Sequence, residues 1–236
     1  FEHILAMTPR IQKANSAFYA KILNEKVRCL IHIEKPTTLL PKVEKTNEEA
    51  LQIGYRLRDS EIINMAHGNV GGSLYVAQQF RESAYRLEQS FPIIDPATKV
   101  EYIRTLLNNY SFLGEFVSQK ETYKKAEKIL SEKERYNKSH IASLREAMSR
   151  SLARMGNIGK ARSFLNQIDM SGVETFFQSE VLRGRMFVCY QDFLRKRRVD
   201  RDEVKHLFDE SRKNKFLPFK RHRSQIATMY QEMYHG

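Results

Sequence analysis

The sequence predicts an all-α fold in which antiparallel helix pairs stack into a right-handed superhelix. Only 10 of its 236 residues are glycine and 6 are proline, and the stretches between them are rich in good helix formers. Residues 144–168 contain two amphipathic segments on either side of the turn Met155-Gly156-Asn157. This helix–turn–helix unit recurs along most of the chain, which is the pattern of a helical-repeat protein.

The chain is expected to begin with a helical segment that ends in a proline-containing loop. Thr8-Pro9 is a helix-start signal, because the hydroxyl can cap the helix and proline suits its first position. The β-branched segment 27–33 has no partner strand nearby, so we interpret it as a continuation of this helix. Pro36 and Pro41 then predict a break and a loop.

Start and stop signals predict the remaining helices in order. Asn47, Ser60, Ser139 and Asp200 are the expected N-caps, and Gly114 is an expected helix end. The predicted helices cover 48–58, 61–78, 80–91, 97–113, 121–132, a pair within 139–168, 173–196, 201–212 and 217–234. The predicted organisation is an N-terminal segment (1–46), a helical-repeat domain (47–213) and a C-terminal helix (214–236).

A repeat of about 34 residues underlies this organisation. Aligning the second helix of each pair on a small or apolar position gives intervals of 34, 42, 35 and 43 residues. A small side chain at this position allows two helices to cross closely. The aligned positions are Ala50, Ala84, Ala126, Ala161 and Val204.

Within 65–96, Gly72, Tyr75, Ala84 and Pro96 fall at characteristic glycine, tyrosine, alanine and closing proline positions. In these residues, and at Gly156 and Ala161 of a later unit, the chain resembles the tetratricopeptide repeat family. The resemblance covers about 47–213 and lacks the family's tryptophan throughout. Repeat packing is the interpretation that we give to Gly72.

The resemblance implies that the first helix of each pair lines a concave groove that holds a peptide or protein segment. Asparagine can pair both ways with a peptide backbone, and arginine can hold a carboxylate. The same positions also fit an ordinary solvated helix surface, and this alternative stays open. The groove positions carried over from the family are Asn69, Ser73, Arg104, Asn108, Ser111, Glu146, Arg150 and Arg154.

The long helices also look like the receptor domain of bacterial cytosolic peptide-pheromone receptors and related transcription regulators. That similarity implies a cytoplasmic sensor or assembly domain, coupled to an output domain that would lie upstream of Phe1. Terminal repeats without a polar cap would also allow a homodimer.

The net charge of +12 suggests a second function class, nucleic-acid binding. Twelve Lys and Arg residues against five Asp and Glu residues lie between positions 195 and 223. A solvated basic face is the alternative interpretation. The candidate patch for nucleic acid or an acidic partner consists of Arg195, Lys196, Arg197, Arg198, Lys220, Arg221 and Arg223.

No motif indicates an enzyme, a metal site or a cofactor. The seven histidines lack ligand spacing, no GxSxG occurs, and the glycines of 67–72 lack a following Lys-Ser/Thr. Cys29 and Cys189 are interpreted as reduced, and the 11 Tyr and 14 Phe are expected in the core. No apolar run approaches the roughly 20 residues of a membrane span.

Overall fold

The computed structural model describes residues 16–33, 36–90, 96–196, 198 and 200–235, and within these ranges it contains helices and turns but no strand. The predicted all-α class is therefore confirmed for this part of the chain. Two compact units make up the chain, Phe1–Gly114 and Glu115–Gly236, and each is described by itself. None of the helices in the described ranges is long and apolar enough to cross a membrane.

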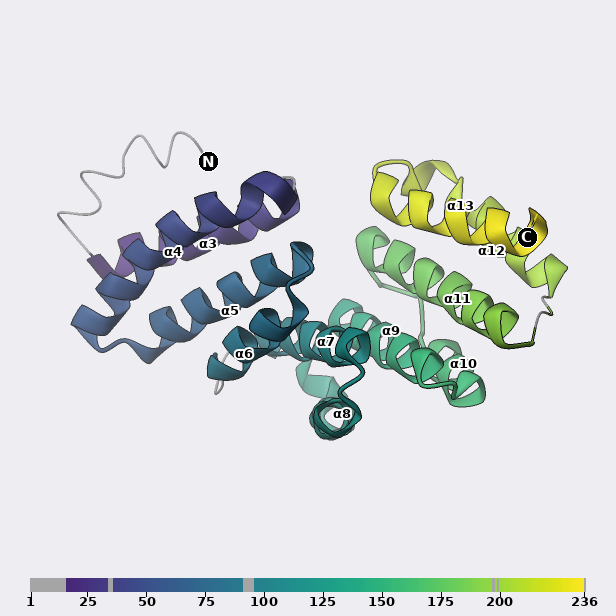
Figure 1. Ribbon diagram of the computed structural model, residues 1–236, viewed down its shortest axis with the longest axis horizontal. Coiled ribbons are helices and arrows are strands. Elements are labelled where there is room, and N and C mark those ends of the chain that lie inside the picture. The colour runs from purple at the N-terminus through teal and green to yellow at the C-terminus, as the bar shows by residue number, and fades with distance from the viewer. Residues whose placement is uncertain (1–15, 34–35, 91–95, 197, 199, 236) are drawn as a thin grey trace. The chain divides into compact units, whose positions relative to one another are not determined.

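The first unit packs its helices in overlapping triads (Figure 1). Its helices are α3 (Ser16–Ile33), α4 (Pro36–Leu57), α5 (Ser60–Val76), α6 (Phe80–Gln89) and α7 (Pro96–Leu113). Helix α4 contacts α3 and α5, which also contact each other, and α6 joins α5 to α7 in the same way. Consecutive helices therefore pack against each other, and α5 also contacts α3 and α7.

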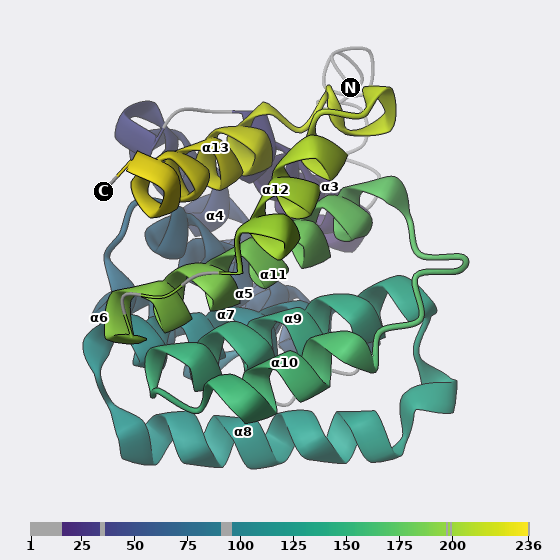
Figure 2. The same ribbon diagram turned by 90° about the vertical axis from the view of Figure 1, so that its right-hand side faces the viewer.

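The second unit repeats this packing, with α9 against α10 and α11, and α11 against α12 and α13 (Figure 2). Helix α8 packs on α9. The elements are α8 (Phe116–Ser131), the 3-10 turn η1 (Lys133–Arg135), α9 (Lys138–Arg154), α10 (Ile158–Asn166), α11 (Thr175–Lys196), α12 (Arg201–Ser211), the 3-10 turn η2 (Asn214–Phe216) and α13 (Lys220–His235).

All five small or apolar positions that aligned the predicted repeat are buried. Ala50, Ala126, Ala161 and Val204 are fully covered, and Ala84 is nearly so. The predicted apolar faces of these helices are therefore buried at these positions.

Several predicted helix ends agree with the structure. Asp200 caps α12 by accepting the amide hydrogens of residues 202 and 203, at 3.1 and 3.0 Å. Gly114 ends α7 and Gly156 ends α9, both in the left-handed region, with φ of 70° and 88°. Glycine is favoured at these two positions because a Cβ would be strained there.

Other predicted starts were wrong. Asp59, one residue before Ser60, caps α5, because its carboxylate accepts from the amides of residues 61 and 62. The cap of α9 is Asn137 rather than Ser139. The Ser139 hydroxyl instead accepts the amide of Glu174 at 3.0 Å, which connects α9 to the start of α11. Helix α8 begins at Phe116, five residues before its predicted start.

The predicted proline loop was also wrong. Helix α4 begins at Pro36, where proline is tolerated, and it continues through Pro41, which costs one hydrogen bond near the helix start. Asn47 is consequently a buried residue inside α4, not an N-cap, and the predicted boundary at 46/47 falls within this helix. The segment 27–33 is helical, as predicted.

Thr8-Pro9 and Pro92, which carried predicted helix ends, lie outside the described residues. The boundary predicted at 213/214 falls between α12 and η2.

Close packing of α5 depends on two of its three glycines. A Cβ on Gly68 would lie 1.7 Å from the Tyr102 hydroxyl oxygen, and one on Gly71 would lie 2.6 Å from Leu87 Cγ. A Cβ on Gly72 would meet only Ile31, at an ordinary 3.5 Å. Gly68 and Gly71 therefore let α6 and α7 approach α5, and the packing role expected of Gly72 belongs to them.

Candidate functional site

The predicted groove positions on α5 point into the first unit. Asn69 is buried, and its Nδ2 donates to the backbone oxygen of Asn24 at 3.0 Å and to its Oδ1 at 3.2 Å. The fully buried Ser73 hydroxyl donates to the Asn69 carbonyl at 2.9 Å. Asn69 thus joins α5 to α3, and Ser73 bonds within α5. Both side chains are buried, so they do not line an open groove.

The predicted groove positions on α9 form a buried ion pair. Glu146 is 0% exposed, and its Oε1 lies 2.6 Å from Nε of Arg150 on the next helical turn. A second contact joins Arg150 Nη2 to Glu146 Oε2 at 3.1 Å. Because each charge is the other's partner, neither is available to an external peptide as predicted.

This pair extends to α11 as a buried charge cluster, which we define as Glu146, Arg150, Glu180 and Arg183. Arg183 Nη2 lies 3.6 Å from Glu146 Oε1 and 3.9 Å from Glu180 Oε1. A Cβ on Gly184 would lie 2.7 Å from Glu146 Cγ, so glycine is what allows α11 to approach the carboxylate. The cluster contains two positive and two negative groups, and its charge is balanced.

His222 of α13 lies beside this cluster as a neutral imidazole. Its Nδ1 is 2.7 Å from the Ser179 hydroxyl of α11, and its ring is 5.4 Å from that of Phe176. Burial, followed by the positive charge of Arg183, lowers the pKa of His222 to about 3. Glu146 opposes this shift more weakly.

The predicted positions on α7 differ from those on α5 and α9, because two of them remain partly accessible. Arg104 and Ser111 are half-buried, whereas Asn108 is buried. The neighbouring Phe112 is 47% exposed, although the sequence predicted that the phenylalanines lie in the core. Among the predicted groove positions that the structure describes, those on α7 are therefore the most accessible.

The last predicted groove position, Arg154, packs within the second unit. Its guanidinium lies over the ring of Phe187, 5.0 Å from the centroid. Its carbonyl accepts from Nη2 of Arg195 at 2.9 Å. Arg195, which belonged to the predicted basic patch, thereby caps the end of α9, as expected for a cation near a helix C-terminus.

Some of the other residues of the predicted basic patch bond within the chain, and others do not. Lys196 pairs with Asp192 at 2.9 Å, and Nη1 of Arg223 donates to the Leu217 carbonyl at 3.3 Å. Arg197 lies outside the described residues. The remaining members are exposed, and none of them forms an ion pair within the described ranges; they are Arg198, Lys220 and Arg221.

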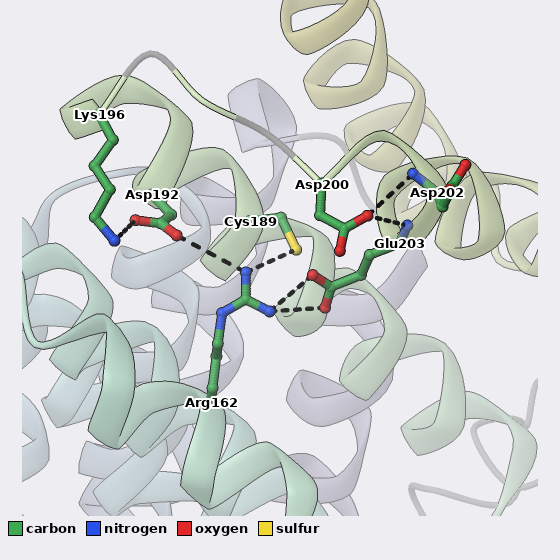
Figure 3. A network of polar contacts seen from close by, with 7 residues as sticks. All are labelled: Arg162, Cys189, Asp192, Lys196, Asp200, Asp202 and Glu203. Carbon is green, nitrogen blue, oxygen red and sulfur yellow. Dashed lines mark hydrogen bonds and ion pairs between the residues drawn. The ribbon is translucent and has the colours of Figure 1, made fainter.

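A further polar network, which sequence reasoning missed, joins three helices of the second unit (Figure 3). Nη1 of Arg162, on α10, donates to both carboxylate oxygens of Glu203, on α12, at 2.8 Å each. Nη2 of Arg162 contacts Cys189 Sγ and Asp192 Oδ2 of α11, at 3.8 and 3.9 Å. The residues are 27 to 41 positions apart in sequence, and no local pattern indicates their pairing.

Of the two free cysteines, Cys29 is exposed and Cys189 is buried. Burial raises the pKa of the Cys189 thiol to about 12, so it remains protonated at neutral pH. No three His, Cys, Asp or Glu side chains among the described residues are arranged to hold a metal ion.

Comparison of the chain with models of protein families, with curated proteins and with solved structures finds no match. The resemblance to the tetratricopeptide repeat family therefore remains an expectation from the sequence.

We predict that the Glu146–Arg150 pair is much more important to stability than an exposed pair of the same spacing. Arg150→Ala should lower the free energy of unfolding by about 3 kcal/mol, because it removes the closest counter-charge of the buried Glu146 and leaves Arg183 at 3.6 Å. The matched control is Arg86→Ala, which breaks the exposed Glu82–Arg86 pair and should cost less than about 1 kcal/mol. Urea unfolding monitored by circular dichroism measures both, and equal losses would contradict the assignment.

We also predict that His222 makes the second unit less stable in mild acid. Its pKa of about 3 in the folded chain lies below the ordinary 6.5 of an unfolded chain, so unfolding takes up a proton as pH falls below about 6.5. Lowering the pH from 7 to 5 should therefore cost about 2 kcal/mol through this group. His222→Gln should remove that part of the pH dependence in urea unfolding curves. An identical pH profile for the variant would show that His222 is not the titrating group.

Proposed function

We propose that the protein is a non-enzymatic helical-repeat domain that binds a peptide or protein segment along α7 of its first unit. The observation that carries the proposal is the exposed, rigidly held ring of Phe112 on the same helix as Arg104 and Ser111. Buried aromatic anchors surrounded by polar groups dominate the energy of most protein interfaces. The resemblance to tetratricopeptide repeats supports the proposal, since this family uses the first helix of each pair for binding.

Phe112 is well suited to act as an anchor because one face of its ring is already fixed. It stacks on Phe80 at a centroid distance of 4.5 Å and an interplanar angle of 8°. Phe80 is itself in tilted contact with Tyr75, at 5.9 Å. A ring held in this way loses little conformational entropy when a partner covers its other side.

Arg104 and Ser111 would supply polar contacts to the bound segment. Positions 104 and 111 are seven residues apart, so they lie on the same side of α7, where Asn108 between them is buried. A guanidinium and a hydroxyl on such a face can hold a carboxylate or a carbonyl oxygen of an extended peptide. By analogy with the bacterial transcription regulators that the long helices resemble, the domain would be a cytoplasmic sensor or assembly part of such a regulator. It would also form a homodimer.

We predict that a segment captured on α7 depends on Phe112. Peptides selected by the full chain from a random displayed library serve as probes, with affinity measured by fluorescence polarisation. Phe112→Ala should weaken binding by about 30-fold, as expected for a hot-spot aromatic residue, and Arg104→Ala should weaken it by about tenfold. Tyr85→Ala is the matched control, because Tyr85 of α6 is 54% exposed. Selected peptides that ignore Phe112 would remove the assignment to α7.

Nucleic-acid binding is the second candidate. Three exposed cations support it, of which Lys220 and Arg221 lie together at the start of α13 and Arg198 lies at the opposite end of the parallel helix α11. A stack of Phe208, Tyr230 and Tyr234 in the same unit, with centroids 4.2 and 4.5 Å apart, does not add to this candidate. The guanidinium group of Arg201 lies over the Tyr234 ring, and that of Arg212 lies over the Phe208 ring. A nucleic-acid base would have to displace them to stack on either ring. Binding would therefore rest on phosphate contacts and would be independent of sequence.

For this candidate we predict a steep salt dependence that the three cations cause. Affinity for a random 20-base-pair duplex should fall with NaCl, and replacing all three by glutamine should reduce the slope of log K against log salt by about 2 to 3. An unchanged slope would exclude the patch. The control is a triple glutamine variant on the exposed face of α8, at Lys120, Lys124 and Lys128.

A further inference from the structure

A surface pocket of about 300 Å³ lies in the second unit, between the start of α9 and the turn that follows α10. Its floor includes the apolar side chains of Ile141, Ala142 and Ile168, and Tyr136 adds a hydroxyl-bearing ring. Its charged lining residues are Lys133, Glu134, Lys138, Arg145 and Asp169. None of these positions belongs to the surfaces considered above.

Arg145 is the unusual group in this pocket, because its acceptors are neutral. Its Nη1 donates to the side-chain and backbone oxygens of Gln167, at 2.5 and 3.4 Å. No carboxylate in the described part of the chain pairs with it, and its Nε is buried without an acceptor there. Burial lowers the pKa of this guanidinium, which still remains charged at neutral pH.

The other charged groups of the pocket do not compensate Arg145. Lys138 Nζ bonds Asp169 Oδ2 at 2.9 Å and also contacts Ser171, so this lysine and aspartate neutralise each other. Hydrogen bonds from Ser171 and Lys138 hold the pKa of Asp169 well below its usual range. The lining contains three cations (Lys133, Lys138 and Arg145) and two carboxylates (Glu134 and Asp169). Its net charge is therefore +1.

We propose that this pocket binds a small carboxylic acid with a short apolar body, whose carboxylate pairs with Arg145. One negative charge would balance the excess, whereas a phosphate dianion would overcompensate it. The apolar floor would receive the hydrocarbon part of the ligand, and the volume is sufficient for a body of four to six carbon atoms. The site is separate from the segment-binding surface proposed on α7 and would serve as a small-molecule effector site.

Nuclear magnetic resonance of the full chain tests this assignment with three probes: 3-methylbutanoate, its neutral amide and inorganic phosphate. The acid should shift the Arg145 side-chain Nε–H signal in a saturable way, with a dissociation constant on the order of millimolar, as expected for so small a ligand. The amide should bind at least about tenfold more weakly, because it lacks the charge-assisted hydrogen bonds. Equal binding of the amide, tighter binding of phosphate, or absence of binding would each overturn the proposal.

Variants locate the site. For the variants, binding is followed on the methyl signals of the acid itself, because Arg145→Gln removes the Arg145 signal. Arg145→Gln should weaken binding of the acid by about tenfold or more, whereas Arg198→Gln, which removes the same charge outside the pocket, should leave it unchanged. Circular dichroism checks that Arg145→Gln is folded. Lys133→Gln, on the exposed turn η1, provides a second variant and should weaken binding by about twofold, since a screened charge is lost. Unchanged affinity in both pocket variants would refute the assignment.

Discussion

The second unit depends on burying four charges without leaving any of them alone. Glu146 and Arg150 of α9 meet Glu180 and Arg183 of α11 where Gly184 lets the two helices approach. Desolvating these groups costs several kcal/mol for each ion, and only their mutual contacts offset that cost. Removing one of these groups would leave its partner buried with less counter-charge. The cluster therefore favours the packing of α9 and α11 in which all four groups are in contact. His222 lies close to these charges and stays neutral.

In the first unit, small residues and hydrogen bonds between neutral groups hold the helices together. Gly68 and Gly71 bring α6 and α7 close to α5, and the Asn69 amide joins α5 to α3. No charge is buried in these contacts, so they carry no comparable pH dependence. This arrangement holds α7 against α5 and α6, and Phe80 supports the ring of Phe112 at the surface. The contacts that stabilise the first unit therefore also hold Phe112 in its exposed position.

The proposed α7 surface and the Arg145 pocket differ in kind. The first is an exposed anchor that a partner would cover, and its strength would come from buried aromatic area. The second is a small cavity whose excess charge calls for a monoanion. The exposed cations Arg198, Lys220 and Arg221 do not form one surface, because α11 and α13 run parallel and Arg198 follows the end of α11 whereas the other two begin α13. The α7 surface lies in one compact unit and the pocket in the other.

The sequence by itself determined the helical class, most helix positions and the buried spacing of Ala50, Ala84, Ala126, Ala161 and Val204. These features follow from local periodicity and capping, which neighbouring residues decide. Pro41 misled the prediction because a proline near a helix start resembles a loop signal.

Only the tertiary structure decided which polar side chains are available. Asn69 forms a hydrogen bond with Asn24, 45 positions away. Glu146 pairs with Arg183, and Arg162 pairs with Glu203. Arg145 pairs with no carboxylate among the described residues. On a helix, every one of these residues looks like a solvated polar position. Whether a charge is paired, buried or open depends on helices that are distant in sequence, and that information is absent from any local pattern.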